Sequence, residues 1–376
     1  MARNLIPFVD LVSQKNRLKA GVMQAMERVL DHGLYIMGPE IADLESILAQ
    51  SSGAKYAISC SSGTDAIMLA LLAKDIKRAD AVFVPAFSYF ATAEAVALLG
   101  ANPIFVDVCP RTFNMDPISL QEAITKIKRT DLKPAGVIAV DLFGQPADYK
   151  ALSQVAEENN LWLIADSSQS FGSGYQGKSI GQFAEISCTS FSPAKPLGGY
   201  GEGGAIFLND DDLYAKVMSC RNHGQNQEDG VRLGFNGHMS SIQAAILLEK
   251  LTVFEEEMQA RQACAERYQK AFAGKLEIPF IAQDCQSSWS QYTLLLDNRD
   301  VVSQDLQEQG IPHRIYYHKP LNEQLAYRRF PVAPNGTPVA KKIAERVLSL
   351  PIHAYLKPET QDWIVAGVLE ACARNS

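Results

Sequence analysis

A lysine and a serine hydroxyl share one glycine-rich stretch, Ser190 to Gly204, which reads SFSPAKPLGGYGEGG. The apolar run before it, Ile186 to Thr189, predicts a short buried strand. The glycines that follow Lys195 keep the next loop open and free of side chains. A lysine placed in such a loop is a candidate nucleophile, because its amine can reach a bound ligand.

The same stretch contains a G-x-G-x-x-G pattern, from Gly199 to Gly204, which also occurs in dinucleotide-binding proteins. That motif requires a helix after the glycines, since helix N–H groups hold the pyrophosphate. Here the glycines lead into Ala205 to Leu208, an apolar run typical of a strand. We therefore reject a dinucleotide site.

A second set of small polar residues, Cys60 to Asp65, lies between a predicted strand and an apolar helix. Free N–H groups and the positive dipole end at a helix N-terminus suit a phosphate. This turn could hold one phosphate together with Ser190 and Asn236. The alternative is an ordinary Ser/Thr helix cap, which capping frequencies alone favour by about three to one.

Asp166 directly follows the apolar strand predicted at Leu161 to Ala165. Ligands bind at the carboxyl ends of parallel strands, where a carboxylate can pair with a protonated ring nitrogen. Gln169 could face the same ligand. The alternative, that Asp166 only caps the turn that follows, is equally weighted.

Tyr89 follows another predicted strand end, in the segment Pro85 to Thr92, and offers a flat surface for stacking. Aromatic residues at strand ends more often belong to the core, so Tyr89 alone is a weak candidate. Its value comes from its place near the other strand ends. The strand ends near residues 60, 89, 166 and 190 are expected to converge on one rim of a sheet.

Together these residues supply the parts that bind pyridoxal phosphate. The lysine would bond covalently to the cofactor aldehyde, and the aspartate would keep the pyridine nitrogen protonated so that the ring can withdraw electrons. The helix start would hold the phosphate, and the aromatic ring would stack on the cofactor. The combination therefore predicts a pyridoxal phosphate enzyme.

The elements around these residues predict an α/β fold with a mainly parallel central sheet covered by helices on both faces. Strands expected at 56–59, 82–85, 104–107, 136–141 and 161–165 alternate with helical segments. Helices are expected at about 20–30, around Leu44 and Leu48, and after the cap signal Asp116-Pro117.

A long amphipathic helix is predicted from Ser240, and its length suits a bridge between two domains. We place a large cofactor-binding domain at residues 1–254 and a smaller α+β domain at residues 255–376. Within the long helix, Glu255 to Glu257 is expected to form a solvated face.

The composition is that of a globular protein with a substantial core: 376 residues, of which 47% are hydrophobic and 20% charged. The formal net charge of -7 does not favour binding to nucleic acid or to an anionic membrane. The N-terminus lacks the long apolar run of an export signal, and no later segment has the uninterrupted apolar length of a membrane span. We expect neither nucleic acid nor a membrane as a partner.

Seven scattered cysteines without C-x-x-C spacing argue against a disulfide framework and favour a reducing cytoplasm. No histidine pair has metal-ligand spacing, so no metal site is predicted. His32 and His223 precede glycines at expected helix ends, where capping is their favoured role. His353 could lie at the surface or face a substrate.

Taken together, these residues resemble the DegT/DnrJ/EryC1/StrS sugar aminotransferases, a family of fold type I pyridoxal phosphate enzymes. The resemblance covers nearly the whole chain, and several variants look closest to the branch that aminates C3 of UDP-3-keto-N-acetylglucosaminuronate. It rests on Phe8–Leu11, Tyr35–Glu40, Ser62–Asp65, Asp141–Gln145, Asp166–Gln169, Ser190–Lys195, Gly201–Gly204, Gln243–Ala245 and Tyr317–Leu321.

The resemblance implies the role of each site residue. Lys195 would bind the cofactor and shuttle the proton, while Asp166 would pair with the ring nitrogen. Gln169 would contact the phenolic oxygen of the ring, and Tyr89 would stack on it. Residues implied to hold the phosphate are Gly63, Thr64, Ser190 and, from the neighbouring subunit, Asn236.

Because Asn236 would come from a second copy of the chain, the resemblance implies a homodimer with shared active sites, in which the loop from His223 to Met239 crosses over. Its substrates would be glutamate and a nucleotide sugar used in cell-surface polysaccharide biosynthesis. Residues implied to reach the nucleotide sugar are Tyr316, Tyr317 and His318.

One position departs from the family pattern, because His238 stands where the family usually has arginine. Histidine cannot replace the permanent bidentate charge of arginine at neutral pH, so the preferred sugar could differ if this position meets a uronate carboxylate or the diphosphate. The alternative is that position 238 only packs the dimer interface. The alternatives are a dTDP-linked 3- or 4-keto-6-deoxysugar aminotransferase and, from another class, a non-catalytic pyridoxal phosphate-binding regulator.

Overall fold

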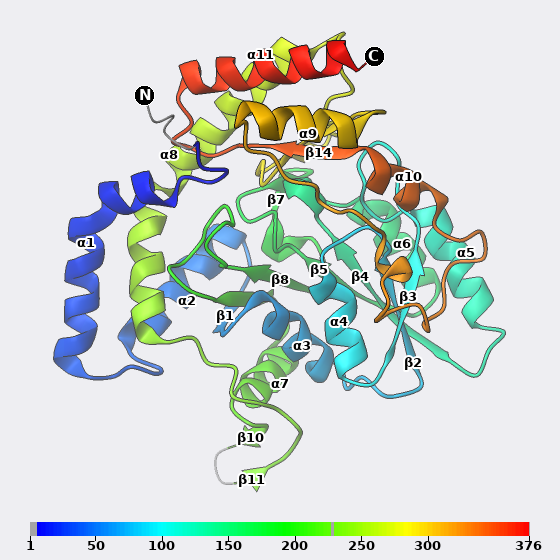
Figure 1. Cartoon of the computed structure of the whole chain (residues 1–376). Coiled ribbons are helices and arrows are strands. Elements are labelled where there is room, and N and C mark those ends of the chain that lie inside the picture. The colour runs from blue at the N-terminus through cyan, green and yellow to red at the C-terminus, as the bar shows by residue number, and fades with distance from the viewer. Residues whose placement is uncertain (1–5, 227–228, 376) are drawn as a thin grey trace.

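The computed structural model describes residues 6–226 and 229–375, which are arranged around a seven-stranded sheet (Figure 1). The strand order is β1-β9-β8-β5-β4-β2-β3. The bounds are β1 Tyr56–Cys60, β2 Asp80–Pro85, β3 Asn102–Val106, β4 Lys133–Val140, β5 Trp162–Asp166, β8 Ile186–Ser190 and β9 Gly204–Leu208.

The sheet is mainly parallel, as predicted. Strands β3, β2, β4, β5 and β8 pair in parallel, whereas β9 is antiparallel to both β8 and β1. Because β1 and β8 are each antiparallel to β9, they run in the same direction. The carboxyl ends of six strands therefore lie along one edge of the sheet.

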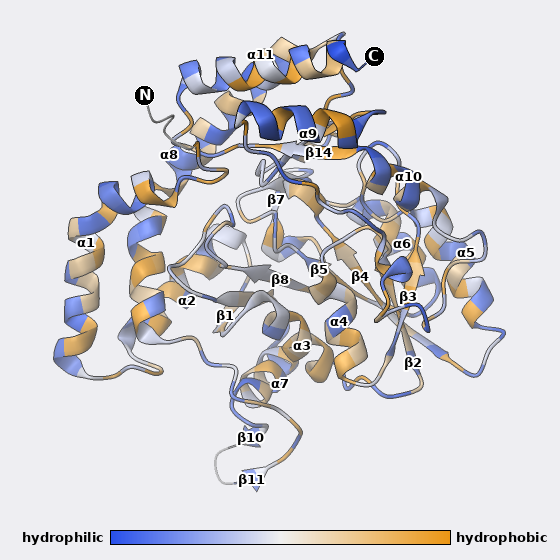
Figure 2. Ribbon diagram, in the orientation of Figure 1, coloured by the Kyte–Doolittle hydropathy of each residue, from blue (hydrophilic) through white to orange (hydrophobic). Residues whose placement is uncertain are grey.

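Alternating residues of the strands enter two separate cores. In β2, Val82 and Val84 pack on one face, while Ala81 and Phe83 pack on the other. The first face is covered by α3 Gly63–Ala73, α4 Phe90–Leu98 and α7 Asp211–Arg221. The second is covered by α2 Pro39–Ser52, α5 Pro117–Ile127, α6 Tyr149–Glu158 and the first half of α8 Ser241–Phe272. Figure 2 shows hydrophobic and hydrophilic residues alternating along α5, as expected for a helix with one buried side.

Helix α1, Leu11–His32, is longer than the predicted segment 20–30. It begins after Asp10, whose Oδ1 accepts a hydrogen bond from the Ser13 N–H at 2.9 Å, a cap that the apolar pattern did not reveal. It ends where predicted, at Gly33, which adopts a φ of +71°. The predicted start of α8 is also confirmed, because Ser240 caps it.

The C-terminal region has an apolar core of its own, which includes Tyr268, Phe272, Tyr292 and Leu348. Its elements are α9 Arg299–Gln309, α10 Pro338–Arg346, α11 Pro358–Arg374 and the antiparallel pair β13 Tyr292–Leu295 and β14 Val347–Leu350. Helix α8 runs unbroken past residue 254 into this region. A smaller domain at 255–376 remains our proposal, which this core supports.

The remaining elements are short. The strands are β6 Gly174–Tyr175, β7 Lys178–Ser179, β10 Gln225–Asn226, β11 Asp229–Gly230 and β12 Cys285–Gln286, and the 3-10 helices are Leu142–Gly144, Ile180–Gln182 and Leu321–Glu323. In the two described ranges, no helix combines the length and apolar character needed to cross a bilayer.

Across those residues, no three His, Cys, Asp or Glu side chains are grouped so as to hold a metal ion. All seven cysteines are free thiols.

Candidate active site

The predicted convergence of strand ends is confirmed by the register of the sheet. Cys60 and Ser190 both pair with Gly204, and Asp166 pairs with Cys188 on β8. The turn after β1, the loop after β8 and Asp166 therefore meet at one edge. The segment after β2 joins them, because the Thr92 hydroxyl on α4 donates to Asp166.

The turn before α3 lies against Ser190. A Cβ atom at Gly63 would lie 2.5 Å from the Ser190 Cβ, so only glycine allows this approach. The Ser62 hydroxyl accepts the Asp65 N–H at 3.1 Å, which confirms the capping interpretation. Capping does not use the first N–H groups of α3, at Gly63 and Thr64, which have no acceptor within the helix. These N–H groups and the buried Ser190 hydroxyl are suited to binding a phosphate. That Gly63, Thr64 and Ser190 bind it stays a prediction.

Asp166 is buried, and both of its carboxylate oxygens accept hydrogen bonds. Thr92 Oγ1 donates to Oδ2 at 2.6 Å, and the Ser168 N–H donates to Oδ1 at 3.2 Å. The second bond is the turn cap that the sequence offered as an alternative. A buried carboxylate at this edge fits a protonated ring nitrogen as its partner.

Asp141 supports the turn after Asp166, a role that the sequence reading missed. Its Oδ2 accepts hydrogen bonds from the hydroxyls of Ser167, at 2.7 Å, and Ser170, at 2.6 Å. Its Oδ1 accepts the hydroxyl of Tyr149 at 2.7 Å. Complete burial raises the pKa of Asp141 to about 6 against the opposing effect of these donors. The serines that flank Asp166 in sequence were the available signal.

Lys195 lies in the turn that follows β8, where its N–H donates to Ser192 O at 2.9 Å. Burial lowers the pKa of the Lys195 amine, and the carboxylates of Asp166 and Glu202 partly oppose this shift. A lowered pKa raises the share of neutral amine, which is the nucleophilic form. Asp166 ends β5 and Lys195 follows the neighbouring parallel strand β8, so both residues lie at the same edge of the sheet.

Gln169 joins the site to a cluster of aromatic rings. Its Nε2 donates to the Tyr317 hydroxyl at 3.4 Å, and its Oε1 accepts the Phe143 N–H at 2.8 Å. The ring of Tyr317 lies 6.3 Å from that of Tyr89, which is 53% exposed and so has a free face for stacking. Tyr316 is turned toward Phe8, with 6.2 Å between ring centroids, and stays a predicted substrate residue, as does Tyr317.

His318, Asn236 and His238 are not brought against Lys195 by any recorded contact among the described residues. His318 and Asn236 are exposed. The segment with Asn236 and His238 is held beside the turn before α3, because the Ser61 N–H donates to Gly237 O at 3.0 Å. Residues 227 and 228 of the predicted crossover loop, 223–239, lie outside the described residues. The roles of all three side chains stay predictions.

His238 lines an open pocket of about 570 Å³ that also includes Lys216, Arg221 and Arg232. Its Nε2 lies 3.3 Å from Asn222 Oδ1. Burial lowers the pKa of His238, and the Arg221 guanidinium lowers it further. A neutral imidazole is therefore favoured at this position.

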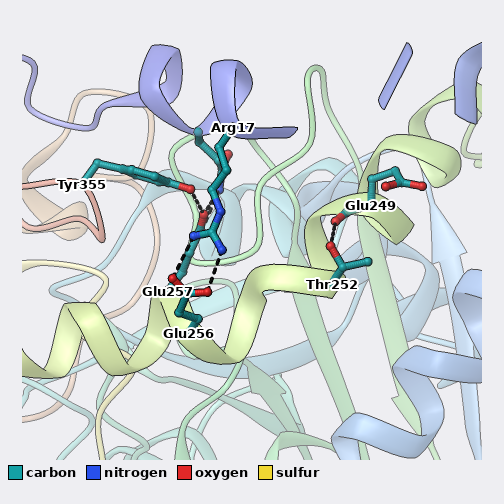
Figure 3. Close-up of polar contacts among 7 residues, drawn as sticks. Arg17, Glu249, Thr252, Glu256, Glu257 and Tyr355 are labelled. Carbon is teal, nitrogen blue, oxygen red and sulfur yellow. Dashed lines mark hydrogen bonds and ion pairs between the residues drawn. The ribbon is translucent and has the colours of Figure 1, made fainter. Parts of the chain in front are cut away.

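Two sequence interpretations are corrected. His353 does not lie at the surface, because only 4% of it is exposed. It lies with Lys195 on the wall of a small cavity, so the substrate-facing alternative stays a prediction. Glu255 and Glu256 are solvated as expected, but Glu257 is buried and accepts hydrogen bonds from Gln14 and Tyr355. Figure 3 shows Tyr355 directed at Glu257, while Arg17 on α1 pairs with Glu256. Residues far apart in sequence thus fill the space beside the second half of α8.

The family model of the DegT/DnrJ/EryC1/StrS aminotransferases matches residues 16–369. The chain belongs to this family. It is accordingly a pyridoxal phosphate-dependent aminotransferase, and the arrangement of Lys195, Asp166, Gly63 and Ser190 fits that cofactor.

Relatives support the assignment over almost the entire chain. The UDP-2-acetamido-2-deoxy-3-oxo-D-glucuronate aminotransferase of Pseudomonas aeruginosa is 43% identical over 94% of this chain and 96% of its own. A crystal structure of a family aminotransferase from Brucella abortus has a TM-score of 0.95 at 42% identity and covers 98% and 99% of the two chains. A structure described as a Streptococcus pneumoniae sugar aminotransferase in its PLP form has a TM-score of 0.87 at 26% identity, covering 94% and 96%.

Burial of His353 generates a pH prediction. Burial and the Arg261 guanidinium lower its pKa to about 4, whereas Asp10 raises it. Between pH 6.5 and 4 the unfolded chain binds a proton at this residue that the folded chain does not, so folding loses on the order of 3 kcal/mol as the pH falls. We expect His353→Gln to flatten this part of the stability curve in urea unfolding.

The exposed His318→Gln is the matched control and should leave the slope unchanged. An unaltered slope in His353→Gln would show that the imidazole titrates normally in the folded protein.

Proposed function

We propose that this nucleotide-sugar aminotransferase moves the amino group of L-glutamate to C3 of UDP-2-acetamido-2-deoxy-3-oxo-glucuronate, for cell-surface polysaccharide biosynthesis. The observation that carries the proposal is the placement of Lys195, just after β8, and Asp166, at the end of the neighbouring strand β5, on the rim where α3 begins. The sugar is proposed from the relative of that specificity, which matches 94% of this chain.

Different residues of this chain have different roles in the proposed reaction. Bound pyridoxal phosphate supplies an electron-withdrawing ring that lets a carbon next to nitrogen lose its proton. Lys195, with its lowered pKa, accepts that proton at Nζ and returns it to the neighbouring carbon position. Asp166 would pair with the ring nitrogen, and the hydrogen bond from Thr92 fixes the orientation of its carboxylate.

The phosphate is proposed to sit between the N-terminus of α3 and Ser190. A helix N-terminus favours an anion through its free N–H groups and its dipole. Asn236 of a second copy would complete this site, so the enzyme is proposed to be a homodimer. Exposed apolar side chains suited to an interface include Leu34, Ile36, Val231 and Leu233, the last 85% exposed. Its seven free thiols fit the reducing cytoplasm as its compartment.

One observation favours a second candidate substrate. A neutral His238 offers no permanent charge to the carboxylate of a uronate sugar. A dTDP-linked 3- or 4-keto-6-deoxysugar lacks that carboxylate and is therefore the alternative.

Amine transfer from ¹⁵N-glutamate separates the two substrates. We expect label in the UDP-linked 3-amino uronate with stoichiometric release of 2-oxoglutarate, and at least tenfold less label with dTDP-keto sugars. Lys195→Ala should abolish the transfer almost completely, since alanine has no amine to bond to the cofactor or to move the proton. Preferred labelling of a dTDP sugar would contradict the proposed substrate, and a fully functional Lys195→Ala would indicate a non-catalytic binding protein.

Subunit mixing tests the shared site. Lys195→Ala and Asn236→Ala subunits are each expected to be inactive alone. If Asn236 serves the partner's site, half of the randomly mixed dimers are hybrids with one intact site in two, which restores about a quarter of wild-type activity. A mixture that stays inactive would mean that Asn236 serves the site of its own chain.

A further inference from the structure

Helix α8 buries a lysine for which the reaction described above gives no role. Lys250 is 2% exposed and is among the largest fully buried side chains. Its Nζ donates to a backbone carbonyl, Gly198 O, rather than to a carboxylate. Burying an ammonium group without a bonded carboxylate is costly, so the position calls for a functional reason.

The contacts of Lys250 are with the loop that carries Lys195. Gly198 comes three residues after Lys195, and the ring of Tyr200 lies 4.2 Å from the Lys250 Nζ. Lys250 therefore binds the segment between β8 and β9 at two points. One is a hydrogen bond, and the other is a cation-aromatic contact.

Lys250 is the middle member of a polar stripe on α8. Gln243, Lys250 and Glu257 are spaced by seven residues, which places them on the same side of the helix. Gln243 Oε1 accepts the Tyr200 N–H at 2.8 Å. Glu257 lies with Lys195 on the wall of a small cavity of about 20 Å³. All three members of the stripe thus face the surroundings of Lys195.

The loop leaves little room for any other arrangement. A Cβ atom at Gly198 would lie 2.4 Å from Pro193 O, and one at Gly199 would lie 2.4 Å from Gln243 Oε1. The Gly199 N–H donates to Phe191 O at 2.7 Å, which closes the turn on itself. Lys250 and Gln243 add anchors to this tight turn from outside, through Gly198 O and the Tyr200 N–H.

We propose that Lys250 is a positioning residue for amine transfer, which fixes the loop of Lys195 through Gly198 O and the Tyr200 ring. The proposal rests on Lys195 being the reacting amine. Lys250 itself touches neither cofactor nor substrate in this account. Its effect is to keep the Lys195 amine within the narrow range of geometry that proton transfer needs.

The surroundings of Lys250 make its charged form less stable than in water, which is consistent with a functional reason for burying it. Burial lowers the pKa of Lys250 to about 8, and Glu257 on the same helix acts in the opposite direction. Tyr200 on the loop faces the amine with its ring. The folded protein thus holds this amine against its preference for water.

Replacing Lys250 by methionine tests the proposal, with the exposed Lys270→Met on the same helix as the matched control. In the cofactor-free protein, we expect Lys250→Met to speed hydrogen exchange in residues 196–204, because their external anchor is lost. In the loaded enzyme, we expect kcat for amine transfer to fall roughly 10- to 100-fold with KM for the nucleotide sugar unchanged. Lys270→Met should match wild type in both measurements.

If Lys250→Met does not fold, Tyr200→Leu replaces it, with Tyr200→Phe as a control that keeps the ring. Tyr200→Leu should then produce faster exchange and the same fall in kcat. Exchange and kcat equal to wild type in the folded Lys250→Met, or in Tyr200→Leu, would overturn the proposal. The exchange experiment needs no substrate, so its outcome is separate from the identity of the sugar.

Discussion

Lys195 and Asp166 lie at the carboxyl edge of the central sheet, where burial lowers the pKa of the lysine amine and the Asp166 carboxylate partly opposes this shift. Desolvation disfavours the charged amine, and the carboxylate favours it, so the balance decides how much neutral amine is present. A lysine in solution would be almost entirely protonated at neutral pH. The reactivity of this amine therefore depends on every element that keeps it buried beside Asp166.

The sheet provides most of that burial. Because β9 is antiparallel between β1 and β8, the chain returns along the sheet directly after Lys195, and Gly204 lies between Cys60 and Ser190. A Cβ atom at Gly204 would lie 2.4 Å from Ser62 O, so glycine is required where the return strand begins. The same hairpin brings the start of α3 against Ser190, where we propose that the phosphate binds.

The residues predicted from the sequence are those whose signal is local. Asp166 and Lys195 each follow an apolar run that ends at the sheet edge, so strand pattern and parallel topology were enough to bring them together. Glu257 could not be predicted, because its buried partner Gln14 lies 243 residues away and the Glu255–Glu257 run looks solvated. Lys250 and Asp141 were missed for the same reason, since a helix position or a strand end does not reveal what packs on it from elsewhere. His238 was singled out only by its departure from a family pattern, so its role does not follow from the local sequence.

The central claim is that Lys195 carries the covalent bond to pyridoxal phosphate, and borohydride reduction of the loaded enzyme tests it most directly. Reduction makes that bond permanent, so peptide mapping by mass spectrometry locates it. The account predicts a pyridoxyl group on Lys195 and none on Lys250, with labelling absent in Lys195→Ala. A modified lysine elsewhere, or an unmodified Lys195 in the active holoenzyme, would contradict it.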